Sequence, residues 1–198
     1  MEKIKWGIIG PGNIANNFAD GLKGSYSGQL VSIASKSEDR RKNFGDKYDI
    51  HPDFRFDSYE DIINSEHIDA IYISTPHTLH AQWTIKAAGK GKHILCEKPG
   101  AINFNEGKKI IDAVREAGVF YMEGFMYRCH PQIPKLVDII KNKIIGDVIS
   151  VETSFGFDMG KTIPDHRLFN KNLAGGGILD VGLYPISFSR LIAGVATG

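Results

Sequence analysis

The sequence predicts an α/β fold in which a doubly wound parallel sheet is followed by the start of a second, α+β domain with an open mixed sheet. Three observations predict it. Short apolar runs alternate with helix-like segments up to about residue 122, a glycine-rich turn joins the first run to the first helix, and the pattern changes near residue 124. Alternating strands and helices are typical of a parallel sheet covered on both faces. We therefore expect a first domain over residues 1–123 and a partial second domain over residues 124–198.

The first apolar run, over residues 4–9, stops at the turn GPGNIA, which has the pattern G-x-G-x-x-A. In dinucleotide sites, the first glycine of such a turn permits a tight bend and the second lets backbone N–H groups approach a pyrophosphate. The small third residue lets the helix pack closely on the strand, and the phosphates lie at the helix N-terminus. The turn therefore predicts a dinucleotide site that includes Gly10, Gly12, Asn13 and Ile14.

The other elements of the first domain follow from apolar periodicity and from end signals. Ser58, with Asp61 three residues later, is typical of a helix N-cap, and Gly118 is typical of a helix end. We expect further strands over residues 29–34, 53–56, 69–74, 92–96 and 119–122, and helices over residues 15–22, 38–48, 79–90 and 105–117, with a short helix after Ser58.

The second domain begins with a predicted helix over residues 131–143 that ends by Gly146. The longest alternating segment of the chain follows, over residues 147–157, and it predicts a strand with one apolar face. A loop, three glycines at residues 175–177 and a helix over residues 178–192 complete the pattern. One strand cannot form a sheet. We therefore expect either a fragment or a chain that borrows strands from a partner.

Composition argues against several classes of function. The 198 residues are 42% hydrophobic and 24% charged, and the formal net charge of +1 provides no field that would attract nucleic acid or an anionic membrane. No apolar run approaches 18 residues, and the chain enters a strand without a signal segment, so we expect a cytoplasmic protein. Cys96 and Cys129 have no metal-binding spacing, and His77 with His80 lacks a third ligand, so no metal is expected.

The end of the second predicted strand bears on the choice of cofactor. NAD sites usually place an acidic residue about 20 positions beyond the glycines. This chain instead has Ser35, Lys36 and Ser37 there, with Arg40 and Arg41 one turn later. A hydroxyl followed by cations suits a 2′-phosphate. We therefore expect Ser35, Lys36 and Arg40 to bind NADP in preference to NAD, the alternative being ordinary solvated surface charges.

Three further motifs accompany the glycine turn: STPHTLH at residues 74–80, GKHILCEKP at residues 91–99 and GGGILDVGLY at residues 175–184. With them, the sequence resembles the Gfo/Idh/MocA oxidoreductases over essentially its whole length. The segment MEGFMYR at residues 122–128, together with Tyr184, is most similar to the branch of dimeric dihydrodiol dehydrogenases and NADP-dependent aldose dehydrogenases. The resemblance implies a Rossmann domain, a substrate domain, and reversible hydride transfer between a nicotinamide and a hydroxyl-bearing carbon of a sugar, cyclitol or trans-dihydrodiol.

The resemblance also implies a catalytic set of Lys98, Asp180 and Tyr184. Lys98 follows a predicted strand at the carboxyl edge of the sheet, and Pro99 restricts it to extended geometry. Asp180 and Tyr184 are four residues apart on a predicted helix and project from one face. Tyr184 would carry the proton, Lys98 would favour its ionisation, and Asp180 would orient the substrate hydroxyl or the lysine. Many relatives have histidine in place of Tyr184. The alternative is that both residues are structural: Asp180 stabilises the helix through its charge near the N-terminus, and Tyr184 is a half-buried packing residue.

Other roles implied by the resemblance are cofactor binding and substrate binding. The cofactor residues are Thr75, Pro76, His80 and Glu97, in addition to Lys98. Arg128 and His166 would face the substrate, the alternative being ordinary polar surface or loop residues. The full-length protein would form a homo-oligomer through its second-domain sheet. Two alternatives stay open: a regulator of the same fold that senses a dinucleotide without turnover, and an inactive fragment of the enzyme.

Overall fold

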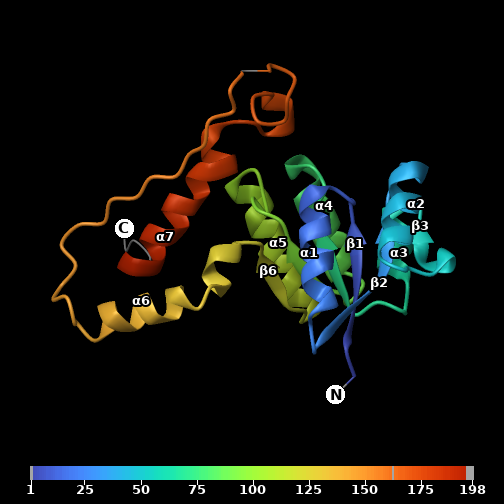
Figure 1. Ribbon diagram of the computed structural model, residues 1–198, viewed down its shortest axis with the longest axis horizontal. Coiled ribbons are helices and arrows are strands. Elements are labelled where there is room, and N and C mark those ends of the chain that lie inside the picture. Colours follow the sequence, from blue (N-terminus) through green and yellow to red (C-terminus); the bar gives the residue numbers. More distant parts are fainter. Residues whose placement is uncertain (1, 162, 195–198) are drawn as a thin grey trace. The chain divides into compact units, whose positions relative to one another are not determined.

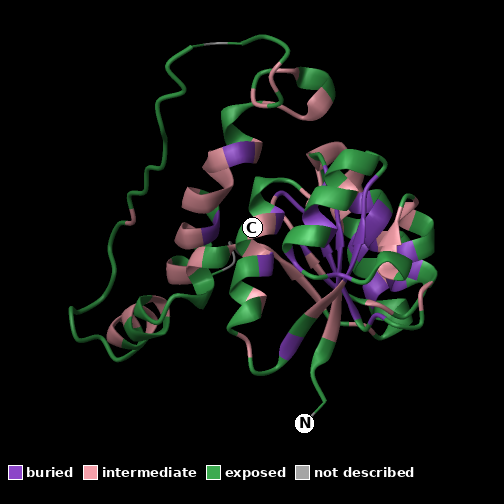
Figure 2. Ribbon diagram, turned by 45° about the vertical axis from the view of Figure 1, so that its right-hand side comes forward, coloured by how far each residue is buried: buried purple, intermediate pink, exposed green. Residues whose placement is uncertain are grey.

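The computed structural model describes residues 2–161 and 163–194. The chain divides between Gly124 and Phe125 into two compact units, each of which is described by itself (Figure 1). Buried residues are concentrated in the sheet of the N-terminal unit (Figure 2).

The N-terminal unit is built on a six-stranded parallel sheet with the order β3-β2-β1-β4-β5-β6 (Figure 1). Its strands are β1 (Ile4–Ile9), β2 (Gly28–Ala34), β3 (Arg55–Phe56), β4 (Ala70–Ile73), β5 (His93–Cys96) and β6 (Tyr121–Glu123). In the sheet register, Ile8 of β1 lies beside Ile33 of β2 on one side and Tyr72 of β4 on the other. The strand order therefore reverses at β1, and the crevice beyond the carboxyl ends of β1 and β4 is where open α/β sheets bind ligands.

Five α-helices connect these strands: α1 (Asn13–Lys23), α2 (Glu38–Lys47), α3 (Tyr59–Asn64), α4 (His80–Ala88) and α5 (Phe104–Ala117). The predicted alternation is confirmed, with small differences at the element ends. Ser58 caps α3 by accepting hydrogen bonds from the backbone N–H groups of Glu60 and Asp61, and Gly118 ends α5 with a φ of 63°. The predicted strand over residues 53–56 is too long. Only Arg55 and Phe56 pair with β2, because the segment begins as the 3₁₀ turn Pro52–Phe54, and the fixed φ of Pro52 suits the start of a turn.

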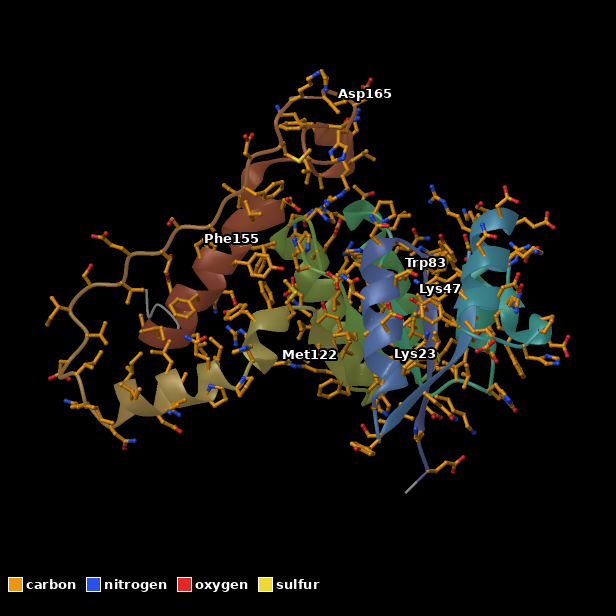
Figure 3. The ribbon with its side chains drawn as sticks, viewed as in Figure 1. Lys23, Lys47, Trp83, Met122, Phe155 and Asp165 are labelled. Carbon is orange, nitrogen blue, oxygen red and sulfur yellow. The ribbon has the colours of Figure 1, made fainter. Side chains whose placement is uncertain are left out.

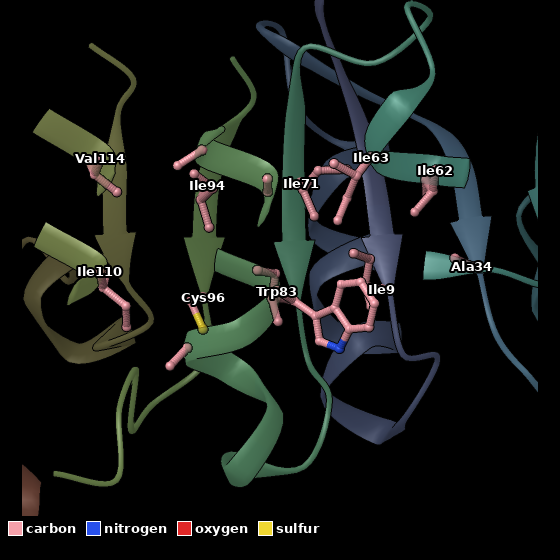
Figure 4. Close-up of a cluster of buried hydrophobic side chains, with 14 of the residues drawn as sticks. Ile9, Ala34, Ile62, Ile63, Ile71, Trp83, Ile94, Cys96, Ile110 and Val114 are labelled. Carbon is pink, nitrogen blue, oxygen red and sulfur yellow. The ribbon is translucent and has the colours of Figure 1, made fainter. Parts of the chain in front are cut away.

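Strand side chains alternate between two apolar layers, as their period of two requires. Ile8, Ile33 and Tyr72 belong to the layer that includes Ala15 and Ala19 of α1. Their neighbours in sequence belong to the opposite layer, under α3, α4 and α5 (Figure 4); these are Ile9, Ala34, Ile71 and Ile73. Each fully buried isoleucine contributes about 1.5–3 kcal/mol relative to an exposed one. The sheet is therefore held rigidly from both faces.

The C-terminal unit contains α6 (Gln132–Lys141), a π-helical turn (Ile178–Gly182) and α7 (Leu183–Ala193), with 3₁₀ turns at Met126–Cys129 and Lys171–Leu173. Helix α6 ends two residues before the predicted position, and Lys143 follows in a left-handed conformation with a φ of 53°.

The predicted strand over residues 147–157 is wrong. The described residues beyond Gly124 contain no strand, so the open mixed sheet is not formed by them. The segment has an alternating pattern but no second strand to accept its backbone hydrogen bonds. It packs along α7 instead: the Thr153 hydroxyl lies 3.2 Å from that of Ser189, and the Phe155 ring lies 5.2 Å from that of Tyr184 (Figure 3).

Candidate functional site

The glycine turn between β1 and α1 has the geometry that a dinucleotide site needs. Gly10 has a φ of +91°, and a Cβ atom there would lie 3.0 Å from the carbonyl oxygen of Ser74, at the end of β4. Gly12 differs: its φ of −94° suits any residue, and a Cβ atom there would meet no protein atom within 4 Å. Gly10 is therefore required by the fold of the turn, whereas the side of Gly12 faces open space in which a pyrophosphate fits.

The N-terminus of α1 has the features of an anion-binding site. Gly12 is the N-cap, and no side chain caps the helix. The first-turn residues Asn13 and Ile14 are exposed, and Ala15 is fully buried against the sheet. Uncapped N–H groups and the helix dipole favour a phosphate at this position. The turn thus fits the dinucleotide predicted for it.

The predicted phosphate-binding residues after β2 divide into two groups. Ser35 is buried; its hydroxyl accepts a hydrogen bond from the N–H of Ser37, and its carbonyl accepts one from the Arg41 guanidinium at 2.7 Å. These contacts shape the turn. Lys36 and Arg40 are exposed at the carboxyl end of β2. Of the three predicted residues, Lys36 and Arg40 are thus the exposed ones, and their role at a 2′-phosphate stays a prediction.

A buried histidine ties the end of β4 to the turn after β5. His80 is fully buried, with Nε2 at 2.7 Å from the Thr75 carbonyl oxygen and Nδ1 at 2.8 Å from the Pro99 carbonyl oxygen. The prediction that His80 itself binds the cofactor therefore needs correction, because a ring with no exposed surface cannot touch a ligand. Its role is to hold Thr75 and Pro99 in place, and Pro99 fixes the neighbouring Lys98.

Thr75 and Pro76 lie at the edge of the sheet where they are predicted. Pro76 is exposed, whereas Thr75 is 7% exposed. Among the described residues, the buried Thr75 hydroxyl has no hydrogen-bond partner. Buried polar groups are nearly always satisfied. The hydroxyl oxygen is itself inaccessible, so its lack of a partner does not point to a ligand, and the cofactor role of Thr75 stays a prediction.

Glu97 and Lys98 follow β5 at the same edge. The Tyr72 hydroxyl of β4 donates a 2.5 Å hydrogen bond to Glu97 Oε1. Burial, followed by the negative charge of Glu97, raises the pKa of the Tyr72 phenol, which keeps the donor protonated. Glu123 Oε1 accepts a hydrogen bond from the N–H of Gly100 at 2.7 Å. The half-buried Lys98 thus lies in a turn whose flanking residues, Glu97 and Gly100, are each held by a hydrogen bond.

Asp180 lies in the π-helical turn before α7 and is 8% exposed. Its Oδ1 lies 3.3 Å from Nη1 of Arg167, a partner that sequence reasoning missed. Arg167 is 13 residues away in a loop, and no periodicity connects the two positions. Single π-helical turns are frequent at functional sites.

Tyr184, in the first turn of α7, is surrounded by aromatic rings. Phe125 and Phe155 meet its ring edge to face at 5.7 and 5.2 Å, and Tyr127 lies 6.2 Å away. Tyr127, Phe155 and Tyr184, with Met126 and Phe188, line a pocket of about 570 Å³ within the C-terminal unit. The packed rings restrict the phenol to a narrow range of orientations, which suits a group that transfers a proton.

The two predicted substrate residues have structural contacts of their own. Arg128 Nη2 donates to the Ser187 hydroxyl at 3.1 Å and to the Ser187 carbonyl at 3.2 Å, which ties the Met126–Cys129 turn to α7. His166 Nδ1 accepts a hydrogen bond from the N–H of Leu168. Neither contact tests substrate binding, so both roles stay predictions.

The structure brings the predicted cofactor residues to one edge of one sheet. Lys98 belongs to the N-terminal unit, whereas Asp180 and Tyr184 belong to the C-terminal unit, so that their joint action stays a prediction. No cluster of three or more His, Cys, Asp or Glu side chains suited to a metal ion occurs in the described part of the chain. Within the same residues, every helix is too short or too polar to cross a membrane.

Comparisons with known proteins agree with this geometry. Residues 4–125 match the family described as "Oxidoreductase family, NAD-binding Rossmann fold", which is the Gfo/Idh/MocA family. The chain is 34% identical over 191 residues to D-xylose 1-dehydrogenase (NADP(+)) 2 of Haloferax volcanii, covering 96% of this chain and 58% of that protein. It is 34% identical over 193 residues to trans-1,2-dihydrobenzene-1,2-diol dehydrogenase of Mus musculus, covering 96% and 56%.

Solved structures show the same likeness. An aldose-aldose oxidoreductase from Caulobacter crescentus, complexed with glycerol, matches with a TM-score of 0.90 and 28% identity over 98% of this chain and 58% of that one. A 3-ketoreductase from Actinomadura kijaniata, in complex with TDP-benzene and NADP, matches with a TM-score of 0.80 and 32% identity over 98% and 57%. The chain thus spans a little over half the length of its relatives. With its glycine turn, parallel sheet and family match in agreement, the chain belongs to the Gfo/Idh/MocA oxidoreductase family.

Proposed function

We propose that this chain is the cofactor-binding part of an NADP-dependent oxidoreductase that acts on the CH–OH group of a sugar, cyclitol or trans-dihydrodiol. One observation carries the proposal: the uncapped glycine turn of α1 lies at the switch point of the sheet, at the same edge as the fixed turn that holds Lys98. A pure nucleotide binder needs the first feature but not the second.

The N-terminal unit supplies the binding surface. The N–H groups at the start of α1 hold the pyrophosphate, while Lys36 and Arg40 meet the 2′-phosphate of NADP. When bound, the nicotinamide supplies the centre that accepts or donates the hydride. Thr75 and Glu97 lie at the edge of the crevice where the nicotinamide would lie. The buried His80 ring contacts the Thr75 carbonyl oxygen and so holds this residue in position.

Lys98, Asp180 and Tyr184 supply the proton transfer. In the oxidation direction, Tyr184 takes the proton of the substrate hydroxyl, and in reduction it returns the proton to the carbonyl oxygen. The Lys98 ammonium stabilises the negative charge that develops on that oxygen and favours the phenolate of Tyr184. Asp180, held by Arg167, orients the substrate hydroxyl. Solved structures of the Actinomadura reductase include variants with a substituted lysine and a substituted tyrosine, the residue types proposed here.

The relatives support the substrate class. Their names give a pentose, a dihydrodiol, aldoses and a sugar ketone as substrates of those proteins. We transfer to this chain only what these substrates share, a secondary or hemiacetal hydroxyl, or the corresponding carbonyl, on a sugar or diol ring. The homo-oligomer expected of the full-length protein is part of the same proposal.

The proposal is tested by following NADPH absorbance while the chain is incubated with NADP and a panel of aldoses, cyclitols and trans-dihydrodiols. We expect turnover of at least one compound, and we expect Tyr184→Phe and Lys98→Met each to lower kcat by 10²-fold or more, about the contribution of general acid–base catalysis. Retained NADPH binding in both variants is the control. Full activity of Tyr184→Phe would contradict the proposed proton transfer. Tight binding without turnover of any compound would contradict activity of this chain and favour one of the two open alternatives, a regulator that only senses the dinucleotide or an inactive fragment of the enzyme.

A further inference from the structure

The surface beside Lys36 and Arg40 contains a third polar group that the sequence did not single out. Tyr59 is the first residue of α3, and α3 follows β3, the neighbour of β2 in the sheet. Lys36 follows β2, and its Nζ lies 5.8 Å from the centre of the Tyr59 ring, within the range of a cation–π interaction. The positive charge of Arg40, in the first turn of α2, also acts on the Tyr59 phenol. Three different elements therefore bring these groups to one place.

The Tyr59 ring is held rigidly. Ser58 caps α3 through hydrogen bonds of 3.1 and 3.3 Å, which fixes the backbone of Tyr59 at the helix start. The ring meets the indole of Trp83 at 5.0 Å and 90°. Trp83 is itself 5% exposed in the core (Figure 3 and Figure 4). The Tyr59 ring is thus fixed in position, and the flexible Lys36 side chain packs over it.

The hydroxyl of Tyr59 is available to a ligand. In the described part of the chain, no side chain or backbone group forms a hydrogen bond with it, and it is not among the buried polar atoms without partners. Burial of the ring raises the pKa of the phenol against the opposing effect of Arg40, so the hydroxyl keeps its proton at neutral pH and can donate it to an acceptor. The adjacent Glu60 carboxylate is paired with Lys86 at 2.6 Å, which reduces its repulsion of an anion.

We propose that Tyr59 is a specificity-determining residue for NADP: its hydroxyl donates a hydrogen bond to the 2′-phosphate, and its ring positions Lys36 for the same group. The inference rests on the proposed function, because it assumes that the dinucleotide lies along the carboxyl edge of the sheet. A phosphate dianion attracts several donors at once, and two cations with one neutral hydroxyl provide them. NADH carries a hydroxyl in place of this phosphate and leaves all three groups unused.

The test is a fluorescence titration of wild type, Tyr59→Phe and Tyr59→Leu with NADPH and, separately, with NADH. Tyr59→Phe keeps the ring and the support for Lys36 but removes the donor. We expect it to raise the Kd for NADPH about tenfold, which corresponds to about 1.4 kcal/mol. Tyr59→Leu also removes the cation–π contact and is expected to raise that Kd further. The Kd for NADH is expected to stay within about twofold of wild type in both variants.

A matched control is Tyr26→Phe, which removes the hydroxyl of a tyrosine that is 97% exposed in the connection between α1 and β2, at the amino edge of the sheet. This variant should bind both dinucleotides like wild type. Equal weakening of NADPH and NADH by Tyr59→Phe, or an unchanged Kd for NADPH, would overturn the role of Tyr59 while leaving the proposed function intact. A folded wild-type chain that binds neither dinucleotide would overturn both.

Discussion

Alanine substitutions in the glycine turn separate a glycine needed for folding from one needed for binding. At Gly10, alanine must adopt a φ near +91°, and its Cβ would lie 3.0 Å from the oxygen and 3.2 Å from the carbon of the Ser74 carbonyl. These are backbone atoms of a central strand end and cannot rotate away. Backbone strain costs about 1–3 kcal/mol and the close contact adds to it, so we expect Gly10→Ala to lower the free energy of unfolding by about 2–4 kcal/mol.

Gly12→Ala should affect NADPH binding more than stability. Its φ of −94° is allowed for alanine and the Cβ meets no protein atom, so the free energy of unfolding should fall by no more than about 1 kcal/mol, the effect of a poorer N-cap residue. The new methyl group would occupy the space in front of α1 that the pyrophosphate needs. We therefore expect the Kd for NADPH to rise at least tenfold, or about 1.4 kcal/mol.

Both effects are measured on the same samples. Urea unfolding followed by tryptophan fluorescence gives stability, and NADPH fluorescence gives the Kd. Gly21→Ala is the matched control: Gly21 lies inside α1 with open space around its Cβ position, so alanine should stabilise the chain by about 0.5–1 kcal/mol and leave the Kd unchanged. A Gly10→Ala variant as stable as wild type, or a Gly12→Ala variant that binds NADPH normally, would refute the reasoning.

Three further predictions concern the buried groups of the N-terminal unit. His80→Ala removes the ring N–H from whichever of the Thr75 and Pro99 carbonyls accepts it, leaving that buried carbonyl without a donor, and should cost about 1–3 kcal/mol in urea unfolding; a loss below about 0.5 kcal/mol would show that the histidine does not tie the two loops. Burial raises the pKa of the Cys96 thiol to about 12, so iodoacetamide should modify the exposed Cys129 in the native chain and spare Cys96; equal labelling of both, measured by peptide mass spectrometry, would contradict this. Because the native pKa of Cys96 lies above its ordinary value of 9.0, the thiol ionises first in the unfolded chain. Its contribution to stability is complete below about pH 9 and declines as the pH rises toward 12, so Cys96→Ala should reduce the fall in melting temperature between pH 8 and pH 10.5, and an unchanged fall would refute this linkage.

Local chemistry was sufficient to predict the N-terminal unit. Its strands carry apolar residues that must alternate between two layers, and its helices begin and end at residues such as Ser58 and Gly118 whose preferences are nearly independent of tertiary context. The glycine turn was predictable for the same reason, because the requirement for glycine at Gly10 comes from the turn itself and from the adjacent strand end.

Long-range contacts were not predictable in this way. The bond from Tyr72 to Glu97 and that from His80 to Pro99 join residues that are 25 and 19 positions apart, and only the sheet order brings them together. The same holds for Lys36 and Tyr59. The strand predicted over residues 147–157 fails for a related reason, since alternation reports which side chains share a face but says nothing of a partner strand. An alternating pattern therefore predicts a strand correctly only where a neighbouring strand is present to form its backbone hydrogen bonds.

The central claim is that the N-terminal unit binds NADP through the glycine turn and the cations after β2. It is tested most directly by titrating the folded chain with NADPH and with NADH, in wild type and in Lys36→Glu. We predict that wild type binds NADPH more tightly than NADH, and that Lys36→Glu weakens NADPH binding alone, because the added carboxylate repels the 2′-phosphate. Equal affinity for the two dinucleotides, or no binding of either by a chain whose circular dichroism shows that it is folded, would contradict the account.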